Sequence, residues 1–260
     1  MKSFVIRTAS GLVIVLLTFF AIISGKMALA FYIFLLSLIG IREFYMAVNN
    51  KNIYPIKAVG YISCVGFLVY NLNYNWASLF NIFLTVTIAI LLSIMFIKRR
   101  INFIDIVLTF FGIIYIPFLF QHIIYLDNKI YIALAFIISW GTDTFAYLVG
   151  CLFGKHKLCP KLSPKKTIEG SFGGILGATI LVYIMAMYFN LRPLWFFVIL
   201  ALTGSIVAQI GDLAASKIKR MTGIKDFGFI MPGHGGILDR FDSILFVATY
   251  IYYILKIFYL

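Results

Sequence analysis

The stretch IYIALAFIISWGTDTFAYLVG, residues 130–150, is a nearly unbroken apolar run with one charged residue, Asp143. The hydrocarbon core of a membrane is about 30 Å thick, and a helix of about 20 apolar residues crosses it. The stretch is therefore predicted to be a transmembrane helix. A carboxylate inside such a helix is costly unless it is paired or faces water. Asp143 is thus either a helix-packing group or part of a functional site, and the sequence leaves both open.

The same apolar character extends along the whole chain. Hydrophobic residues make up 63% of the 260 positions and charged residues 12%, and the mean hydropathy is +1.03. This composition excludes a soluble domain. Only helices or closed barrels satisfy the backbone in lipid, and continuous runs of this length favour helices. We therefore expect an all-α polytopic membrane protein with about nine transmembrane helices. The predicted spans are approximately 3–24, 28–48, 55–72, 77–97, 102–124, 130–152, 171–189, 194–214 and 241–258.

Basic residues lie unevenly about these predicted spans. The formal net charge is +13, and all but four of the 22 Lys and Arg residues fall on one side of the membrane. The four exceptions are Lys26, Lys129, Arg192 and Lys256. Cytoplasmic loops carry an excess of Lys and Arg, so the rich side is predicted to be cytoplasmic. Because the charge follows the spans, we expect a multi-pass protein of the cell (inner) membrane and no nucleic-acid partner.

The chain is expected to have two unequal parts. Residues 1–126 are predicted to form about five spans with few charges, among them Arg42, Glu43 and Asp105. We interpret these charges as anchors at the membrane interface. Residues 127–260 hold the dense polar clusters, so we expect the functional region there. The three cysteines have no CxxC spacing, which indicates neither a disulfide framework nor a zinc site.

Carboxylates and cations recur at helical spacing in the second part. One predicted helix face combines a carboxylate, a hydroxyl and a cation, namely Asp212, Ser216 and either Lys219 or Arg220. Asp239 and Asp242 are three residues apart, so they share a face at the start of the last span. A helix N-terminus also favours negative charge. N-terminal capping explains one of these two carboxylates but not both.

A glycine-rich turn, PGHGG at residues 232–236, precedes the last span. Such a loop can bind an anion through its backbone N–H groups, although a simple turn between helices is the commoner meaning. His234 has no partner His or Cys at metal-binding spacing. The turn together with the neighbouring carboxylates and basic residues is more specific than the turn alone. Carboxylate oxygens suit Mg²⁺, Lys and Arg suit phosphate, and together they are typical of phosphoryl or nucleotidyl transfer.

Several of these segments resemble one known signature. SKIKR at 216–220, KD at 225–226 and PGHGGILDRFDS at 232–243 are similar to the motif of the phosphatidate cytidylyltransferase (CDP-diacylglycerol synthase) family, which here spans residues 216–243. The resemblance extends to DTFAY at 143–147, LSPKKT at 162–167 and EG at 169–170. The motifs cover roughly residues 139–243, whereas the first half matches the family only in hydropathy and length.

The resemblance implies a homodimeric, all-helical, Mg²⁺-dependent membrane enzyme with its active site facing the cytoplasm. Its reaction would convert CTP and phosphatidate, a membrane lipid, into CDP-diacylglycerol and pyrophosphate in phospholipid biosynthesis. The residues expected to hold metal are Asp212, Asp239 and Asp242, with Asp143 as a supporting neighbour. Those expected to act in catalysis are Lys219, Arg220, Lys225, Asp226 and Arg240. Those expected to bind substrate phosphates are Ser163, Lys165, Lys166, Ser216 and His234.

A polytopic transporter with a cytoplasmic-side ion or anion site is the alternative reading. A transporter would place ionisable groups near the bilayer midplane on broken helices. Here most of them lie in loops or at span ends, and Asp143 is the main exception. A membrane scaffold would need no clustered carboxylates. The sequence also lacks the DG, AR and paired-Asp motif of the CDP-alcohol phosphotransferases.

Overall fold

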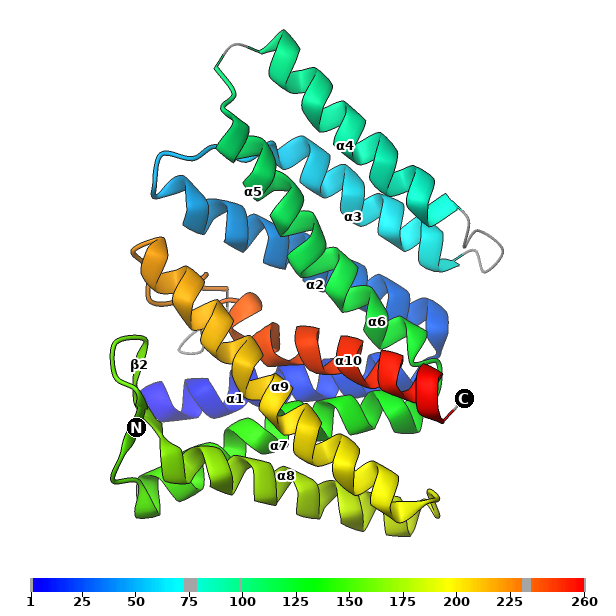
Figure 1. The fold of residues 1–260 in the computed structure, drawn as a ribbon, viewed down its shortest axis with the longest axis vertical. Helices are drawn as coiled ribbons and strands as arrows, with labels where there is room; N and C mark the ends of the chain where they lie inside the picture. The colour runs from blue at the N-terminus through cyan, green and yellow to red at the C-terminus, as the bar shows by residue number, and fades with distance from the viewer. Residues whose placement is uncertain (1, 73–78, 99, 231–234, 260) are drawn as a thin grey trace. The chain divides into compact units, whose positions relative to one another are not determined.

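The computed structural model describes residues 2–72, 79–98, 100–230 and 235–259. Each range predicted as a span contains helix (Figure 1). The helical segments are α1 (Lys2–Ile23), α2 (Lys26–Asn49), α3 (Lys57–Leu72), α4 (Leu79–Ile97), α5 (Phe103–Ile113), η2 (Ile114–Phe118), α6 (Leu119–Tyr125), α7 (Lys129–Phe153), α8 (Ile168–Tyr188), α9 (Leu194–Met221) and α10 (Leu238–Phe258).

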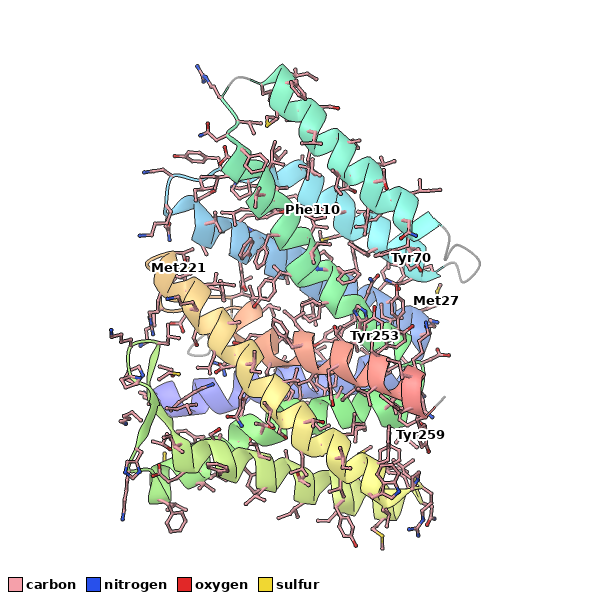
Figure 2. All side chains as sticks on the ribbon, viewed as in Figure 1. Met27, Tyr70, Phe110, Met221, Tyr253 and Tyr259 are labelled. Carbon is pink, nitrogen blue, oxygen red and sulfur yellow. The ribbon has the colours of Figure 1, made fainter. Side chains whose placement is uncertain are left out.

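Seven helices within the described residues are long and apolar enough to cross a membrane. Two further apolar helical stretches, Ser10–Ile23 and Lys57–Leu72, are shorter. The chain is therefore a multi-pass membrane protein, and the count of nine spans stays a prediction. Figure 2 shows side chains along all the helices, and large apolar ones are exposed within the predicted spans, as at Ile62 and Phe172, which are 68% and 63% exposed. Lipid tails are a suitable environment for such faces.

The span from Phe103 to Tyr125 contains a local change of helix type. Residues Ile114–Phe118 form a π-helical turn that includes Pro117. Proline lacks a backbone N–H and disrupts the regular hydrogen bonding of an α-helix. A π-turn adapts the helix to such a residue. The chain therefore continues through α5, η2 and α6 as one apolar segment.

The chain divides into two compact units that interleave along the sequence. Unit 1 comprises Met1–Ile124 with Met221–Arg240, and unit 2 comprises Tyr125–Arg220 with Phe241–Leu260. In unit 1, helix α2 packs against α1, α3, α5 and η2. The Tyr45 hydroxyl donates a hydrogen bond to the Thr109 carbonyl at 2.9 Å. A Cβ at Gly60 or Gly112 would lie 2.6 or 2.7 Å from the Tyr45 ring, so these glycines allow the helices to pack closely.

Two carboxylates near span ends of unit 1 are buried within the protein. Glu43 and Asp105 are each only 3% exposed, so neither is an exposed anchor. Asp105 accepts hydrogen bonds from the backbone N–H groups of Asn102 and Tyr54, at 2.8 and 2.6 Å. It thereby caps the start of α5 and holds the α2–α3 connection. Both carboxylates bind backbone groups, which their position in the sequence does not reveal.

In unit 2, helices α7 and α8 lie side by side along much of their length (Figure 1). Glycines on α8 make this approach close. A Cβ at Gly174 would lie 2.7 Å from the Thr142 carbonyl oxygen, and Cβ atoms at Gly173 and Gly177 would clash with Val149 and Phe145. Small residues let helices approach closely in membranes. This packing fixes the part of α7 that carries Asp143.

A short β-hairpin connects α7 to α8. Strands β1 (Lys157–Cys159) and β2 (Ser163–Thr167) pair antiparallel, with Lys157 opposite Thr167 and Cys159 opposite Ser163. We predicted an all-helical protein and no strands, so the hairpin is an addition to that prediction. Lysines occupy much of this segment and hide the alternation of apolar and polar residues that normally marks a strand.

Candidate active site

Two carboxylates meet in unit 2 where α7 lies beside α10. The Ser243 hydroxyl donates to Asp143 Oδ2 at 3.3 Å, and the Ser243 backbone N–H donates to Asp242 Oδ1 at 2.8 Å. The hydroxyls of Ser139 and Ser243 lie 2.6 Å apart. Asp242 is buried, whereas Asp143 is exposed. Ser243 therefore holds one buried and one accessible carboxylate near each other.

Helix α9 brings a third carboxylate to this place. A Cβ at Gly211 would lie 3.1 Å from the Asp242 carbonyl oxygen, so α9 and α10 cross closely at that point. The next residue, Asp212, forms an ion pair with Lys166 of β2. Their side chains are 21% and 29% exposed, respectively. The hairpin and α9 are thus joined at the cluster by a partly buried pair of opposite charges.

The charges of this cluster act on one another. Burial lowers the pKa of the Lys166 ammonium group, the Asp143 and Asp242 carboxylates oppose this effect, and Lys219 adds to it. Together with Asp212, the cluster has three carboxyl groups and two ammonium groups, so a bound cation would improve its charge balance. Across the described ranges, no group of three or more His, Cys, Asp or Glu side chains has an arrangement that could hold a metal ion by itself.

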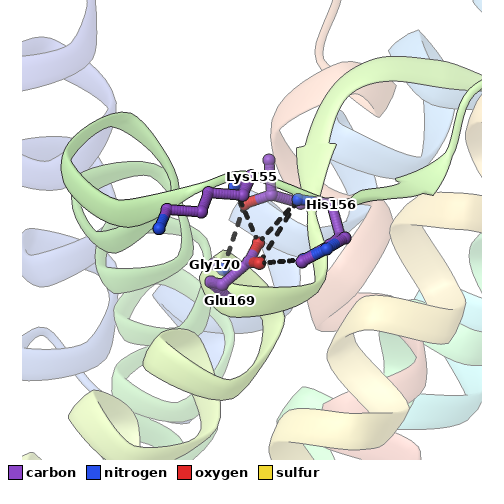
Figure 3. A network of polar contacts seen from close by, with 5 residues as sticks. Lys155, His156, Glu169 and Gly170 are labelled. Atoms are coloured by element: carbon purple, nitrogen blue, oxygen red, sulfur yellow. Dashed lines mark hydrogen bonds and ion pairs between the residues drawn. The ribbon is translucent and has the colours of Figure 1, made fainter.

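Glu169 fastens the base of the hairpin (Figure 3). Its carboxylate accepts hydrogen bonds from the backbone N–H groups of Lys155 and His156, at 3.1 and 3.2 Å, and contacts His156 Nδ1 at 2.6 Å. The Thr167 hydroxyl caps α8 by accepting from the Gly170 N–H at 3.1 Å. These hydrogen bonds therefore hold both ends of the hairpin in place, where it follows α7 and where it leads into α8.

The strand geometry of β2 separates its two lysines. Successive side chains of a strand point to opposite faces, and Lys165 is exposed while Lys166 is partly buried against Asp212. The Arg220 side chain donates to the Leu162 carbonyl at 3.4 Å and so links the end of α9 to the hairpin turn. Lys166 faces the carboxylates, and Lys165 is free to reach a ligand from the outer face.

The described part of the signature segment in unit 1 is organised by Asp239. Its Oδ2 accepts hydrogen bonds from the Phe227 N–H at 2.7 Å and the Gly236 N–H at 2.9 Å. Lys225 and Arg240 are exposed and Asp226 is partly exposed. Because Asp239 binds both Phe227 and Gly236, its side chain holds together the two ends of the loop that precedes α10. His234 lies outside the described residues.

Comparison with known proteins identifies the family. The model of the cytidylyltransferase family matches residues 5–258. This chain belongs to the cytidylyltransferase family. A Staphylococcus haemolyticus protein named phosphatidate cytidylyltransferase is 38% identical over 253 residues, which cover 93% of this chain and 95% of that protein. Proteins of the same name from Staphylococcus epidermidis and Staphylococcus aureus are each 35% identical, with the same coverage.

Several residues that the sequence analysis assigned to the site lie near one another in this cytidylyltransferase-family member, and their roles stay a prediction. Among the predicted residues, unit 2 brings Asp143, Lys166, Asp212 and Asp242 together, and Lys219 within electrostatic reach of Lys166. Ser216 lies on the same helix as Asp212, and Ser163 begins β2. Asp212 and Asp239 belong to different units, so their joint role as metal ligands stays a prediction.

Two serines that lie beside these carboxylates were not among the residues predicted for the site. Ser139 lies four residues before Asp143, and Ser243 directly follows Asp242. The spacing of four places Ser139 on the same helix face as Asp143, which is a signal that could have identified it. Ser243 is part of the quoted signature, but nothing in its spacing shows that its hydroxyl reaches α7.

Proposed function

We propose that this chain is a phosphatidate cytidylyltransferase that makes CDP-diacylglycerol and pyrophosphate from CTP and phosphatidate. Membership in the cytidylyltransferase family and the name shared by its relatives support this activity. The single observation that carries the proposal is the cluster of carboxylates and lysines in unit 2. The relatives carry the name of an enzyme, so the transporter alternative gains no support from them.

The chemistry suits a site without a strong general base. A phosphate oxygen of phosphatidate, already anionic near neutral pH, forms a bond to the α-phosphorus of CTP. The bond from that phosphorus to the oxygen bridging to the β-phosphate breaks, and pyrophosphate leaves with the electron pair. The obstacle is repulsion between two anions. Lys166 and Lys219 can reduce it, since positioning and charge neutralisation account for most catalysis in phosphoryl transfer.

Other basic residues are proposed to hold phosphate groups. Lys165 on the outer face of the hairpin and Arg220 beside its turn can contact either substrate from the exposed side. Lys225 and Arg240 are exposed cations of the signature segment and suit the same purpose. Ser163 and Ser216 can donate hydroxyl hydrogen bonds to phosphate oxygens. These assignments rest on exposure, charge and the resemblance of the motifs.

We propose Mg²⁺ as the cofactor, and the donor set of unit 2 fits it. Mg²⁺ is commonly bound by one or two carboxylates, with phosphate oxygens and water completing its coordination. Asp242 and Asp143, held near each other by Ser243, supply such a carboxylate pair. Asp212 pairs with Lys166 and Asp239 with loop amides, so either would have to exchange its present partners to bind metal. Bound Mg²⁺ would offset the negative charge of the triphosphate.

The direct test is turnover by the purified protein with labelled CTP and phosphatidate. We expect labelled CDP-diacylglycerol and pyrophosphate, complete loss with a chelator, and recovery when Mg²⁺ is restored. Absence of product with Mg²⁺ present, from protein that remains folded, would refute the proposed activity.

Cross-linking of the same preparation tests the implied homodimer. A band only at the monomer mass of 29.5 kDa would refute it.

We also propose that the hairpin and the site face the cytoplasm, because basic residues are concentrated in that loop. In a chain whose native cysteines are replaced by serine, Lys161→Cys should react with an impermeant reagent only from the cytoplasmic side. Lys129→Cys, before the other end of α7, should react only from the opposite side and serves as the matched control. Reaction of Lys161→Cys from outside alone would overturn this topology.

A further inference from the structure

A buried carboxylate from α2 binds the start of α10 within unit 1. The Glu43 side chain accepts hydrogen bonds from the backbone N–H of Ile237 at 3.0 Å and of Leu238 at 2.9 Å. Glu43 is 3% exposed, and its partners lie 194 and 195 positions further along the chain. The first N–H groups of a helix lack partners within the helix. Here both oxygens of a distant carboxylate satisfy N–H groups at a helix start.

Two glycines of the signature segment lie directly against this carboxylate. A Cβ at Gly236 would clash with Glu43 Oε2, and a Cβ at Gly228 would clash with Glu43 Oε1. Any larger residue at either position would have to displace Glu43 or the loop. The backbone of the signature segment is therefore in close contact with Glu43 at Gly228 and again at Gly236.

Asp239 completes the arrangement from within the segment. It accepts from the N–H groups of Phe227 and Gly236, while Glu43 accepts from the next two residues, Ile237 and Leu238. Three consecutive amides before and at the start of α10 thus bind two carboxylates. Asp239 and Arg240 follow immediately, so their positions depend on how these amides are held.

We propose that Glu43 is a positioning residue that sets the signature segment, and through it Asp239 and Arg240, for the reaction. This inference rests on the proposed function, which gives Arg240 a role in phosphate binding and makes Asp239 a metal ligand only after it exchanges its amide partners. Glu43 itself need not touch a substrate. Hydrogen bonds to an ionised acceptor are stronger than neutral ones, so a carboxylate holds the segment more firmly than an amide would.

The kinetic test compares Glu43→Gln with a matched variant. Glutamine offers one acceptor oxygen and presents its NH₂ group to the second N–H, so one of the two bonds is lost. Because misplacing reacting groups by about 1 Å can cost about 100-fold, we expect Glu43→Gln to lower kcat per folded molecule by at least about tenfold, with smaller changes in KM. Glu43→Asp, which keeps both acceptor oxygens, should retain more activity than Glu43→Gln.

The matched control is Asp105→Asn. Asp105 is equally buried in the same unit and also binds two backbone N–H groups, but those of Asn102 and Tyr54. We expect it to lower the thermal stability about as much as Glu43→Gln while leaving kcat of the folded protein near the wild-type value. Equal losses of kcat in Glu43→Gln and Asp105→Asn would show that Glu43 contributes only to stability, and this result would overturn the proposal.

Hydrogen exchange gives a readout that does not require activity. In Glu43→Gln, amides of residues 235–240 should exchange faster while those at the start of α5 stay unchanged, and Asp105→Asn should give the reverse. Unchanged exchange at 235–240 would overturn the proposal. Faster exchange in a protein whose wild type makes no CDP-diacylglycerol would instead confirm that Glu43 holds the segment and refute the proposed reaction.

Discussion

Asp242→Asn is expected to lower CDP-diacylglycerol formation by about 100- to 1,000-fold, the size of effect seen when one preorganised electrostatic group is removed from an active site. Asparagine keeps the size of the side chain and can still accept the Ser243 N–H, but it carries no negative charge. Asp242 is buried beside Asp143, Lys166 and Lys219. The change therefore alters the charge of the cluster while leaving its packing nearly intact. Turnover at saturating substrates measures the effect.

A control separates this effect from a loss of helix packing. Tyr250 of α10 donates a hydrogen bond to the Thr203 hydroxyl of α9 at 2.6 Å, away from the carboxylates. Thr203→Val removes that acceptor and should lower the stability of the protein but change its activity little.

Asp143→Asn should resemble Asp242→Asn in its loss of activity. The variant that carries both changes should be scarcely less active than either single one, because residues acting as a unit are strongly non-additive. Near-normal turnover by Asp242→Asn would exclude its carboxylate from the reaction.

The helices could be predicted from the sequence because lipid allows so few backbone conformations. Unsatisfied N–H and C=O groups are costly in hydrocarbon, so long apolar runs become helices whatever their detailed sequence. The predicted range 130–152 lies within α7, Lys129–Phe153, and the range 28–48 lies within α2, Lys26–Asn49. Asp212 and Lys219 could be placed on one helix face because a spacing of seven residues matches two turns of an α-helix, and both lie in α9.

The parts that could not be predicted depend on contacts between distant segments. Glu43 sits in an apolar helix near a span end, and nothing nearby in the sequence shows that it binds residues 237 and 238. The hairpin was missed because Lys165 and Lys166 are both charged, although they point to opposite faces. For Asp143, the sequence left packing and function equally open. Its hydrogen bond from Ser243, which comes 100 residues later, shows that it belongs to the carboxylate cluster.

Lys166→Met is expected to lower activity by about 100-fold or more, because it removes a cation from the site where two anions meet. Methionine has a similar length and no charge. The change also leaves the carboxylate of Asp212 without its partner in a partly buried ion pair, so it is expected to lower the stability of the protein as well. Thermal unfolding and turnover must therefore be measured on the same preparation. Lys161→Met, an exposed lysine in the same hairpin turn, is the matched control and should behave like the wild type.

The double variant Lys166→Met/Asp212→Leu distinguishes two roles for Lys166. Replacing both members of an ion pair by apolar residues of similar volume is often close to neutral for stability, so the double variant should unfold near the wild-type temperature. If Lys166 offsets the charge of substrate phosphates, the double variant stays low in activity, and lower than the variant changed at Asp212 alone, because the cation is still missing. If Lys166 only neutralises Asp212, activity returns together with stability. Recovery to more than about a tenth of the wild-type rate, against the roughly 100-fold loss expected from removing the cation, would therefore exclude Lys166 from contact with the reacting phosphates.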